Sequence, residues 1–82
     1  MEGITELKVE KSGNDLRLCF ELKAVNLNRC FVISDTDGNI LLKGVLEESK
    51  SHQIAISFLK KGSFLIHIIE GEKLFFSPFS IE

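Results

Sequence analysis

Apolar and polar residues alternate with a period of two along most of this chain. The clearest run pairs apolar Leu16, Leu18, Phe20 and Leu22 with intervening Arg17, Cys19, Glu21 and Lys23. Successive side chains of a β-strand point to opposite faces, so this period predicts strands with one buried face. The inward residues expected of the other strands are Leu7, Val9, Phe31, Ile33, Ile40, Leu42, Ile54, Ile56, Phe64, Ile66, Ile68, Leu74, Phe76, Phe79 and Ile81.

Turn-forming residues separate these runs, at 12–15, 35–39, 60–62 and 70–72. The segment 41–51 is interpreted as a strand followed by a charged loop, Glu47–Ser51, so no helix is expected. A chain of 82 residues has room for one hydrophobic core. Residues 1–82 are therefore expected to form a single domain, an all-β, antiparallel two-sheet immunoglobulin-like sandwich of about seven strands.

The composition argues against several classes of partner. Ten Lys and Arg are scattered among twelve Asp and Glu, so no basic stripe indicates nucleic-acid binding. The longest apolar runs, such as 64–69, fall far short of the ~20 residues that span a bilayer, so no membrane insertion is expected. The opening Met1–Glu6 lacks the features of a secretory signal. Carbohydrate binding is disfavoured because the chain contains no Trp or Tyr.

The strands in the middle and at the end of the chain depart from simple alternation, because their outward positions are also apolar. In a two-layer sandwich only one face of each sheet is buried inside, so the other face would be an exposed apolar patch of the kind that marks an interface. The alternative is that a terminal strand or loop covers it. The candidate interface for a protein partner or for self-association is formed by Val32, Leu65, His67, Ile69 and Phe75.

The segment Asp35–Asn39 has carboxylates at alternate positions followed by glycine, as in some calcium loops. An EF-hand loop needs glycine at its sixth position and glutamate at its twelfth, but here Gly38 is fourth and Leu46 is twelfth. The favoured interpretation is a tight hairpin in which Asp35 accepts hydrogen bonds from the turn amides and Gly38 adopts a positive φ.

Neither the cysteines nor the histidines form a recognisable catalytic or metal motif. Cys19 and Cys30 are both expected at outward positions, too far apart for a disulfide, and no histidine stands at zinc-ligand spacing. His52 and His67 are expected as surface or interface residues. An enzyme using His67 with Cys30 or Ser34 would need those groups to meet in a concave pocket. The sequence therefore predicts no catalytic residues, no cofactor and no metal.

Two segments resemble the C-terminal sorting domain of the type IX secretion system. Phe31–Leu41 is similar to its strand-turn-strand pattern "v-x-I-y-D-x-x-G-k-x-v", and Ile54–Ile68 to its pattern "I-x-L-s-x-L-x-k-G-x-Y-x-v-x-I". Sorting domains tend to finish on a basic residue, whereas this chain finishes Phe75–Glu82. That ending, with Gly62–Gly71, is more similar to a neighbouring family of small exported proteins that are assigned only a domain of unknown function.

The resemblance implies an immunoglobulin-like sandwich without catalysis and with an extracellular or periplasmic location, which the N-terminal residues themselves do not indicate. The resulting expectation is a non-catalytic binding or structural module of an exported or envelope protein. The alternative that the resemblance implies is a C-terminal sorting domain read by a secretion system, with Lys60, Lys61 and Gly62 near the recognised loop.

Overall fold

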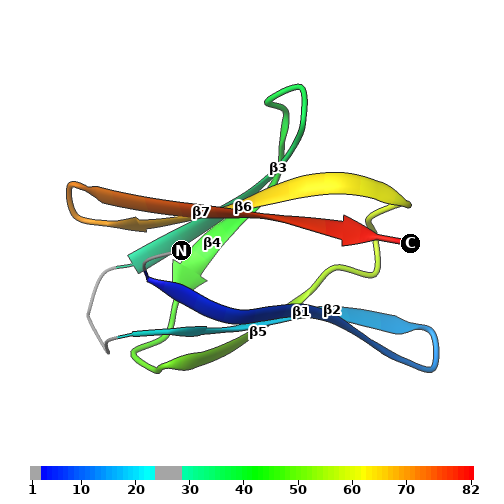
Figure 1. Cartoon of the computed structure of the whole chain (residues 1–82), viewed down its shortest axis with the longest axis horizontal. Helices are drawn as coiled ribbons and strands as arrows, with labels where there is room; N and C mark the ends of the chain where they lie inside the picture. Colours follow the sequence, from blue (N-terminus) through cyan, green and yellow to red (C-terminus); the bar gives the residue numbers. More distant parts are fainter. Residues whose placement is uncertain (1–2, 24–28) are drawn as a thin grey trace.

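Seven strands form two antiparallel sheets in the computed structural model, which describes residues 3–23 and 29–82 (Figure 1). The strands are β1 (Ile4–Ser12), β2 (Asp15–Leu22), β3 (Arg29–Asp35), β4 (Ile40–Leu46), β5 (Ser51–Ala55), β6 (Gly62–Glu70) and β7 (Lys73–Ile81). Sheet A has the order β1-β2-β5, and sheet B has the order β4-β3-β6-β7. The prediction of an all-β, antiparallel two-sheet sandwich of seven strands is confirmed. Within the described ranges there is no helix that could cross a bilayer.

The core lies between the two sheets and is built from the alternate residues of facing strands. Leu18 of sheet A and Ile33, Ile66 and Ile68 of sheet B are fully buried, as is Ile56, which follows β5. The neighbouring positions Arg17, Val32 and His67 point the other way. The inward positions predicted for 16–22, 31–33, 54–56 and 64–68 are therefore confirmed, because burying one face selects one parity of the strand.

A β-bulge in β1 lets both of its ends contribute to the core. The register passes from Thr5 opposite Glu21 to Lys8 opposite Cys19, which places one extra residue in β1. Glu6 adopts a φ of 53° at this point. The extra residue reverses the parity, so Ile4 is buried while Leu7 and Val9 also pack against the core.

Strand β7 corrects part of the predicted alternation. It pairs with β6 without a register shift from Lys73 to Ile81, so buried Phe79 and Ile81 fix the parity of the whole strand. Phe75 therefore faces the core, whereas Leu74 and Phe76 face outward with 59% and 53% of their surface exposed. The prediction that Leu74 and Phe76 point inward and Phe75 outward is wrong, because three consecutive apolar residues leave the parity ambiguous locally.

Strand β4 contains a second correction and a close approach. The register shifts between Ile33 and Ser34, so Ile40 pairs with Ser34 and lies exposed on the outer side, contrary to the prediction. Gly44 lies opposite Phe31, and a Cβ at this position would be 2.8 Å from Phe31 Cε1. The glycine therefore makes room for the Phe31 ring at the edge of the core.

A small polar cluster, which alternation cannot predict, lies at one end of the sandwich. Arg29 begins β3 and is 1% exposed, and its Nη2 donates a hydrogen bond of 2.9 Å to the carbonyl oxygen of Ser49. His52 Nε2 lies 2.7 Å from the same oxygen, and its ring stacks on Phe20 with centroids 5.4 Å apart. His52 is thus buried rather than at the surface, and the cluster ties the β4–β5 loop to the core.

His52 should make the stability of the protein sensitive to mild acid. Its burial lowers its pKa below the ordinary value of 6.5, and the nearby Arg29 charge acts in the same direction, against the Ser49 hydrogen bond. Because unfolded His52 takes up a proton more readily than folded His52, the free energy of unfolding falls as the pH drops below about 6.5. The fall ends once the pH is below the pKa of the folded state.

Urea unfolding measured between pH 5 and 8 tests this expectation, with His52→Gln expected to flatten the dependence above pH 5, where most carboxylates remain ionised. The same slope in His52→Gln and in the wild type would show that other groups cause it.

Candidate interaction face on sheet B

The outer face of sheet B consists of three cross-strand rows of side chains that run from β4 through β3 and β6 to β7. The rows are Val45-Cys30-Ile69-Leu74, Lys43-Val32-His67-Phe76 and Ile40-Ser34-Leu65-Pro78. Lys43 is the one member with a formal charge at neutral pH when the histidine is neutral. Directly opposed side chains of neighbouring strands lie close enough to contact. The three rows therefore form one continuous and mainly apolar surface.

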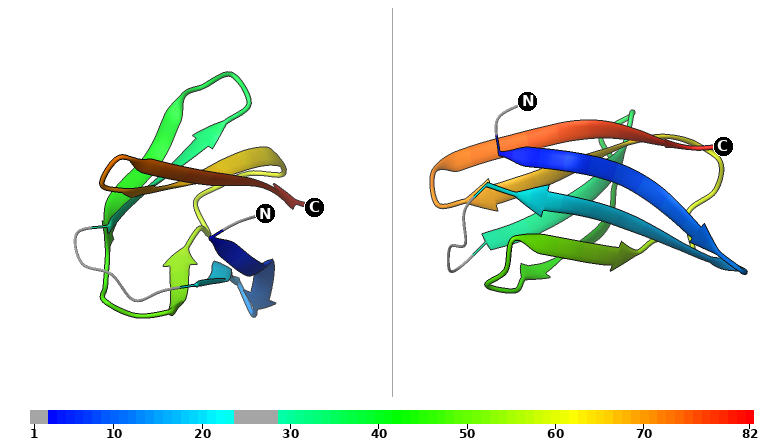
Figure 2. Two further views of the ribbon diagram at one scale, coloured as in Figure 1. Left: turned by 60° about the vertical axis from the view of Figure 1, so that its left-hand side comes forward. Right: turned by 60° about the horizontal axis from the view of Figure 1, so that its bottom comes forward.

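No described segment covers this surface. Strand β1 pairs with β2 in sheet A, on the other side of the core, and β7 is itself an edge strand of sheet B. The two further views show sheet A packed on the inner side of sheet B alone (Figure 2). Ile40, Val45, Ile69, Leu74 and Phe76 are accordingly exposed. Within residues 3–23 and 29–82, the alternative of a covering terminal strand or loop does not occur.

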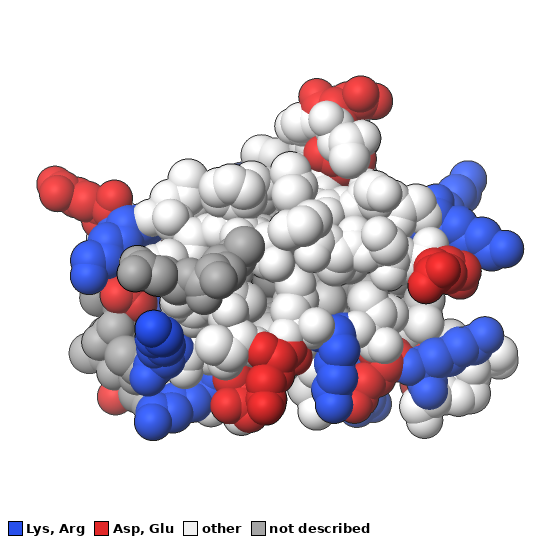
Figure 3. Space-filling model, viewed as in Figure 1, with Lys and Arg blue, Asp and Glu red and all other residues white. Residues whose placement is uncertain are grey.

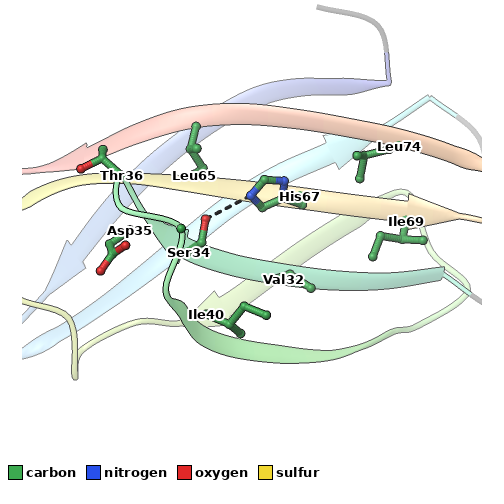
Figure 4. Close-up of a pocket in the computed structure, with 10 residues that line it drawn as sticks. Val32, Ser34, Asp35, Thr36, Ile40, Leu65, His67, Ile69 and Leu74 are labelled. Carbon is green, nitrogen blue, oxygen red and sulfur yellow. Dashed lines mark hydrogen bonds between the residues drawn. The ribbon is translucent and has the colours of Figure 1, made fainter.

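The β3–β4 hairpin turns this surface into an open groove. The tip of the hairpin rises from sheet B on the side away from sheet A (Figures 1 and 2). Asp35, Thr36, Gly38 and Ile40 line the groove on the hairpin side, and the volume is about 410 Å³. Its floor comes from β3, β6 and β7 through Val32, Ser34, Leu65, His67, Ile69 and Leu74 (Figure 4).

The turn at the tip of the hairpin is held by the side chain of Asp35. Oδ1 of Asp35 accepts hydrogen bonds of 2.9 Å from the backbone amides of Asp37 and Asn39, and Oδ2 accepts one of 2.9 Å from Asn39 Nδ2. The amide groups of Asn39 lower the pKa of this carboxyl below its ordinary value. Gly38 has a φ of 90°. The predicted hairpin turn is confirmed in both respects.

His67 and Ser34 meet at the centre of the groove. His67 Nε2 lies 3.1 Å from Ser34 Oγ, as the dashed line in Figure 4 marks. The ring also contacts Phe76, with centroids 6.2 Å apart. A histidine that activates a hydroxyl usually needs a third group to orient it, and the nearby Asp35 carboxylate is engaged within its own turn. Since Ser34 is buried, the hydrogen bond is best explained as satisfying its hydroxyl.

Four of the five predicted interface residues lie together in this groove: Val32, Leu65, His67 and Ile69. The fifth, Phe75, lies on the opposite side of sheet B, where it packs against the core beside Gly3. Ile40, Leu74 and Phe76 also belong to this outer face, although the alternation predicted them to point inward. For the last two a signal was present, since an unbroken strand over 74–81 that turns Phe79 and Ile81 inward must turn Leu74 and Phe76 outward.

The outer face of sheet A has a different character. It carries charged residues, including Lys8 and Glu10, whose Nζ and Oε2 lie 3.1 Å apart, and Arg17, which donates to Gln53. Figure 3 shows charged side chains along this side and at the ends of the molecule, with few over sheet B apart from the β3–β4 tip. The outer face of sheet A is therefore charged, whereas the outer face of sheet B is mainly apolar.

The two cysteines are free and lie on the outer faces of different sheets. Cys19 is buried and its Sγ lies 3.4 Å from Glu10 Oε1. Burial raises the pKa of this thiol, which keeps it protonated and weakly nucleophilic. Cys30 is exposed on sheet B. In the part of the chain that the structure describes, no three His, Cys, Asp or Glu side chains gather as metal ligands would.

Comparison with known proteins adds no family. No protein-family model matches this chain, and the search of curated proteins found no match. The functional interpretation therefore rests on the uncovered apolar face of sheet B and its groove.

Proposed function

We propose that this protein is a non-catalytic binding or structural module that makes contact through the outer face of sheet B. The observation that carries the proposal is that no described segment covers the three cross-strand rows on this face. Lys43 is the one lysine among otherwise uncharged side chains in these rows. Exposed apolar surfaces of this continuity usually mark sites of protein association. The hairpin wall adds a shape that a partner can recognise.

We further propose that the sandwich is of the immunoglobulin-like type. In support, the first, second and fifth strands share one sheet while the third, sixth and seventh share the other, as in immunoglobulin constant domains. The difference is β4, which pairs with β3 instead of joining the sheet of the fifth strand. The resemblance to exported sandwich proteins extends the proposal to an extracellular or periplasmic module, which fractionation of the source cells would test.

Replacing Ile69 with Glu should weaken binding and leave the fold intact. Ile69 occupies the middle of an apolar row, so a carboxylate there would have to be desolvated in any contact. Because the side chain points away from the core, the free energy of unfolding should change by less than about 1 kcal/mol. Binding should weaken at least about tenfold, as at an interface hot spot.

Circular dichroism checks the fold of Ile69→Glu. Sedimentation velocity of the purified protein measures self-association. Chemical cross-linking in an extract of the source cells detects binding to a partner protein. Gln53→Glu introduces the same charge on the outer face of sheet A and serves as the control. Unfolding of Ile69→Glu would show that this residue belongs to the core. Unchanged association of the folded variant would contradict the proposed contact surface.

A further inference from the structure

We infer that the occupant of the outer face of sheet B is a second copy of this chain, packed face to face about a twofold axis parallel to the strands. The inference rests on the proposed function and names its partner. It follows from three features of the face, which are its area, the order of residues within each row and the position of its one charge.

The area of the face suits a weak dimer. Neighbouring strands lie about 4.8 Å apart and rise about 3.3 Å per residue, so four strands over about seven residues cover roughly 450 Å² of flat area. Two such faces together would bury roughly 900 Å² of flat area, which side-chain roughness raises to about 1,000 Å². That is about the lower limit for a specific interface, so the dimer should be transient and concentration-dependent.

Each row of one copy fits the same row of the second copy when the strand order of the second copy is reversed. A twofold axis parallel to the strands preserves the position along each strand and reverses the strand order, so β4 of one copy lies over β7 of the other. In the central row Lys43 then lies over Phe76 of the second copy, and Val32 lies over its His67. In the first row Val45 lies over Leu74 of the second copy. Each lysine thus meets an aromatic ring, which favours a cation.

The position of Lys43 distinguishes this arrangement from the other twofold. An axis perpendicular to the strands would keep the strand order and place β4 over β4, with the two Lys43 side chains near each other in an apolar layer. Like charges so placed repel and lose solvation. The parallel axis separates the two lysines to opposite edges of the interface and leaves no charge opposite a like charge.

The wall of the groove limits movement of the second copy along the strands. The wall formed by Asp35, Thr36 and Gly38 rises at the end of the face next to the row Ile40-Ser34-Leu65-Pro78. A flat apolar face alone would allow a second copy to slip along the strands. The wall limits this movement at one end of each copy. In this arrangement Val32, which lines the groove, lies against His67 of the second copy.

Sedimentation equilibrium of the whole chain, from about 1 µM to about 1 mM, tests whether a dimer forms. The expected result is a reversible monomer–dimer equilibrium. Ile69→Glu and Leu74→Glu should each raise the dissociation constant at least about tenfold, and Gln53→Glu should leave it unchanged. Leu74→Glu is included because Leu74 is well exposed, so this variant is expected to fold even if Ile69→Glu does not.

A chain that stays monomeric to about 1 mM overturns the inference. If Ile69→Glu still abolishes capture of another protein in that case, the proposed function survives with a different occupant.

Cross-linking by thiol oxidation tests the orientation. In a background with both native cysteines replaced by Ser, Lys43→Cys and Phe76→Cys are prepared as separate variants and then mixed. The expected product is the mixed disulfide, which mass spectrometry separates from either symmetric one, since residues 43 and 76 face each other only across the inferred twofold. Cross-linking of Lys43→Cys with itself in preference to Phe76→Cys would overturn the inferred axis.

Discussion

Ile66→Ala is expected to lower the free energy of unfolding by about 4 kcal/mol. Ile66 has no exposed surface and lies in the middle of β6, opposite Ile33 of β3. Removing three carbons there leaves a cavity that two packed sheets cannot close fully. A domain of this size is stabilised by roughly 4 to 12 kcal/mol, so the variant should be near the limit of folding.

Thermal and urea unfolding measure this loss, which should lower Tm by roughly 16 °C or more. The control is Leu74→Ala, a similar truncation on the outer face, which should change the free energy of unfolding by about 0.5 kcal/mol or less. Both variants must be compared at low protein concentration, so that self-association does not contribute. Equal losses in the two variants would show that sheet B buries its other face.

Arg29→Ala is expected to lower the free energy of unfolding by about 2 to 4 kcal/mol. The substitution removes a side chain that is 1% exposed and takes away one of the two donors to the Ser49 carbonyl oxygen. The β4–β5 loop then loses its attachment to the start of β3. Arg29→Met keeps much of the apolar volume and should cost less.

The ion pair between Arg29 and Glu70 should contribute less to the free energy of unfolding than the packing of Arg29 and its hydrogen bond to the β4–β5 loop. Arg29 Nη1 and Glu70 Oε2 are 4.0 Å apart, and the Glu70 side chain is 23% exposed, so solvent screens the attraction. Glu70→Gln should therefore cost no more than about 1 kcal/mol. Urea unfolding of Arg29→Ala, Glu70→Gln and the double variant separates the contributions. A Glu70→Gln loss as large as that of Arg29→Ala would assign the effect to the charge pair instead.

Local patterns predicted the regular parts of this protein well. The run Leu16–Leu22 and the turn at Asp35–Asn39 each depend on residues close in sequence, namely the parity of one strand and the hydrogen bonds of one carboxylate. Predictions failed where a shift of one residue reverses the parity. Ile40 follows a register shift in β3–β4, and Phe75 belongs to an apolar triplet whose direction depends on pairing with β6.

The candidate site could be predicted in outline for the same reason. Val32, Leu65, His67 and Ile69 were found because they interrupt a pattern that would otherwise place polar residues outside. The groove wall was not predictable, since the bend of the β3–β4 hairpin away from sheet A is a property of the sheet and not of the turn residues. The burial of Arg29 could not be predicted either, because a charged residue at a strand end ordinarily lies in solvent.

The sequence by itself determined that this chain forms short antiparallel strands with tight turns, because alternation and turn chemistry act over a few residues. It also determined that β3 and β6 would carry apolar side chains on both faces. Alternation also indicated the inner face of these two strands, with Ile33 and Ile66 inside and Val32 and His67 outside. Only the tertiary structure decided that no described segment covers the outer face. Whether a second layer packs there depends on where the other strands lie, and that is set by contacts between residues distant in the chain.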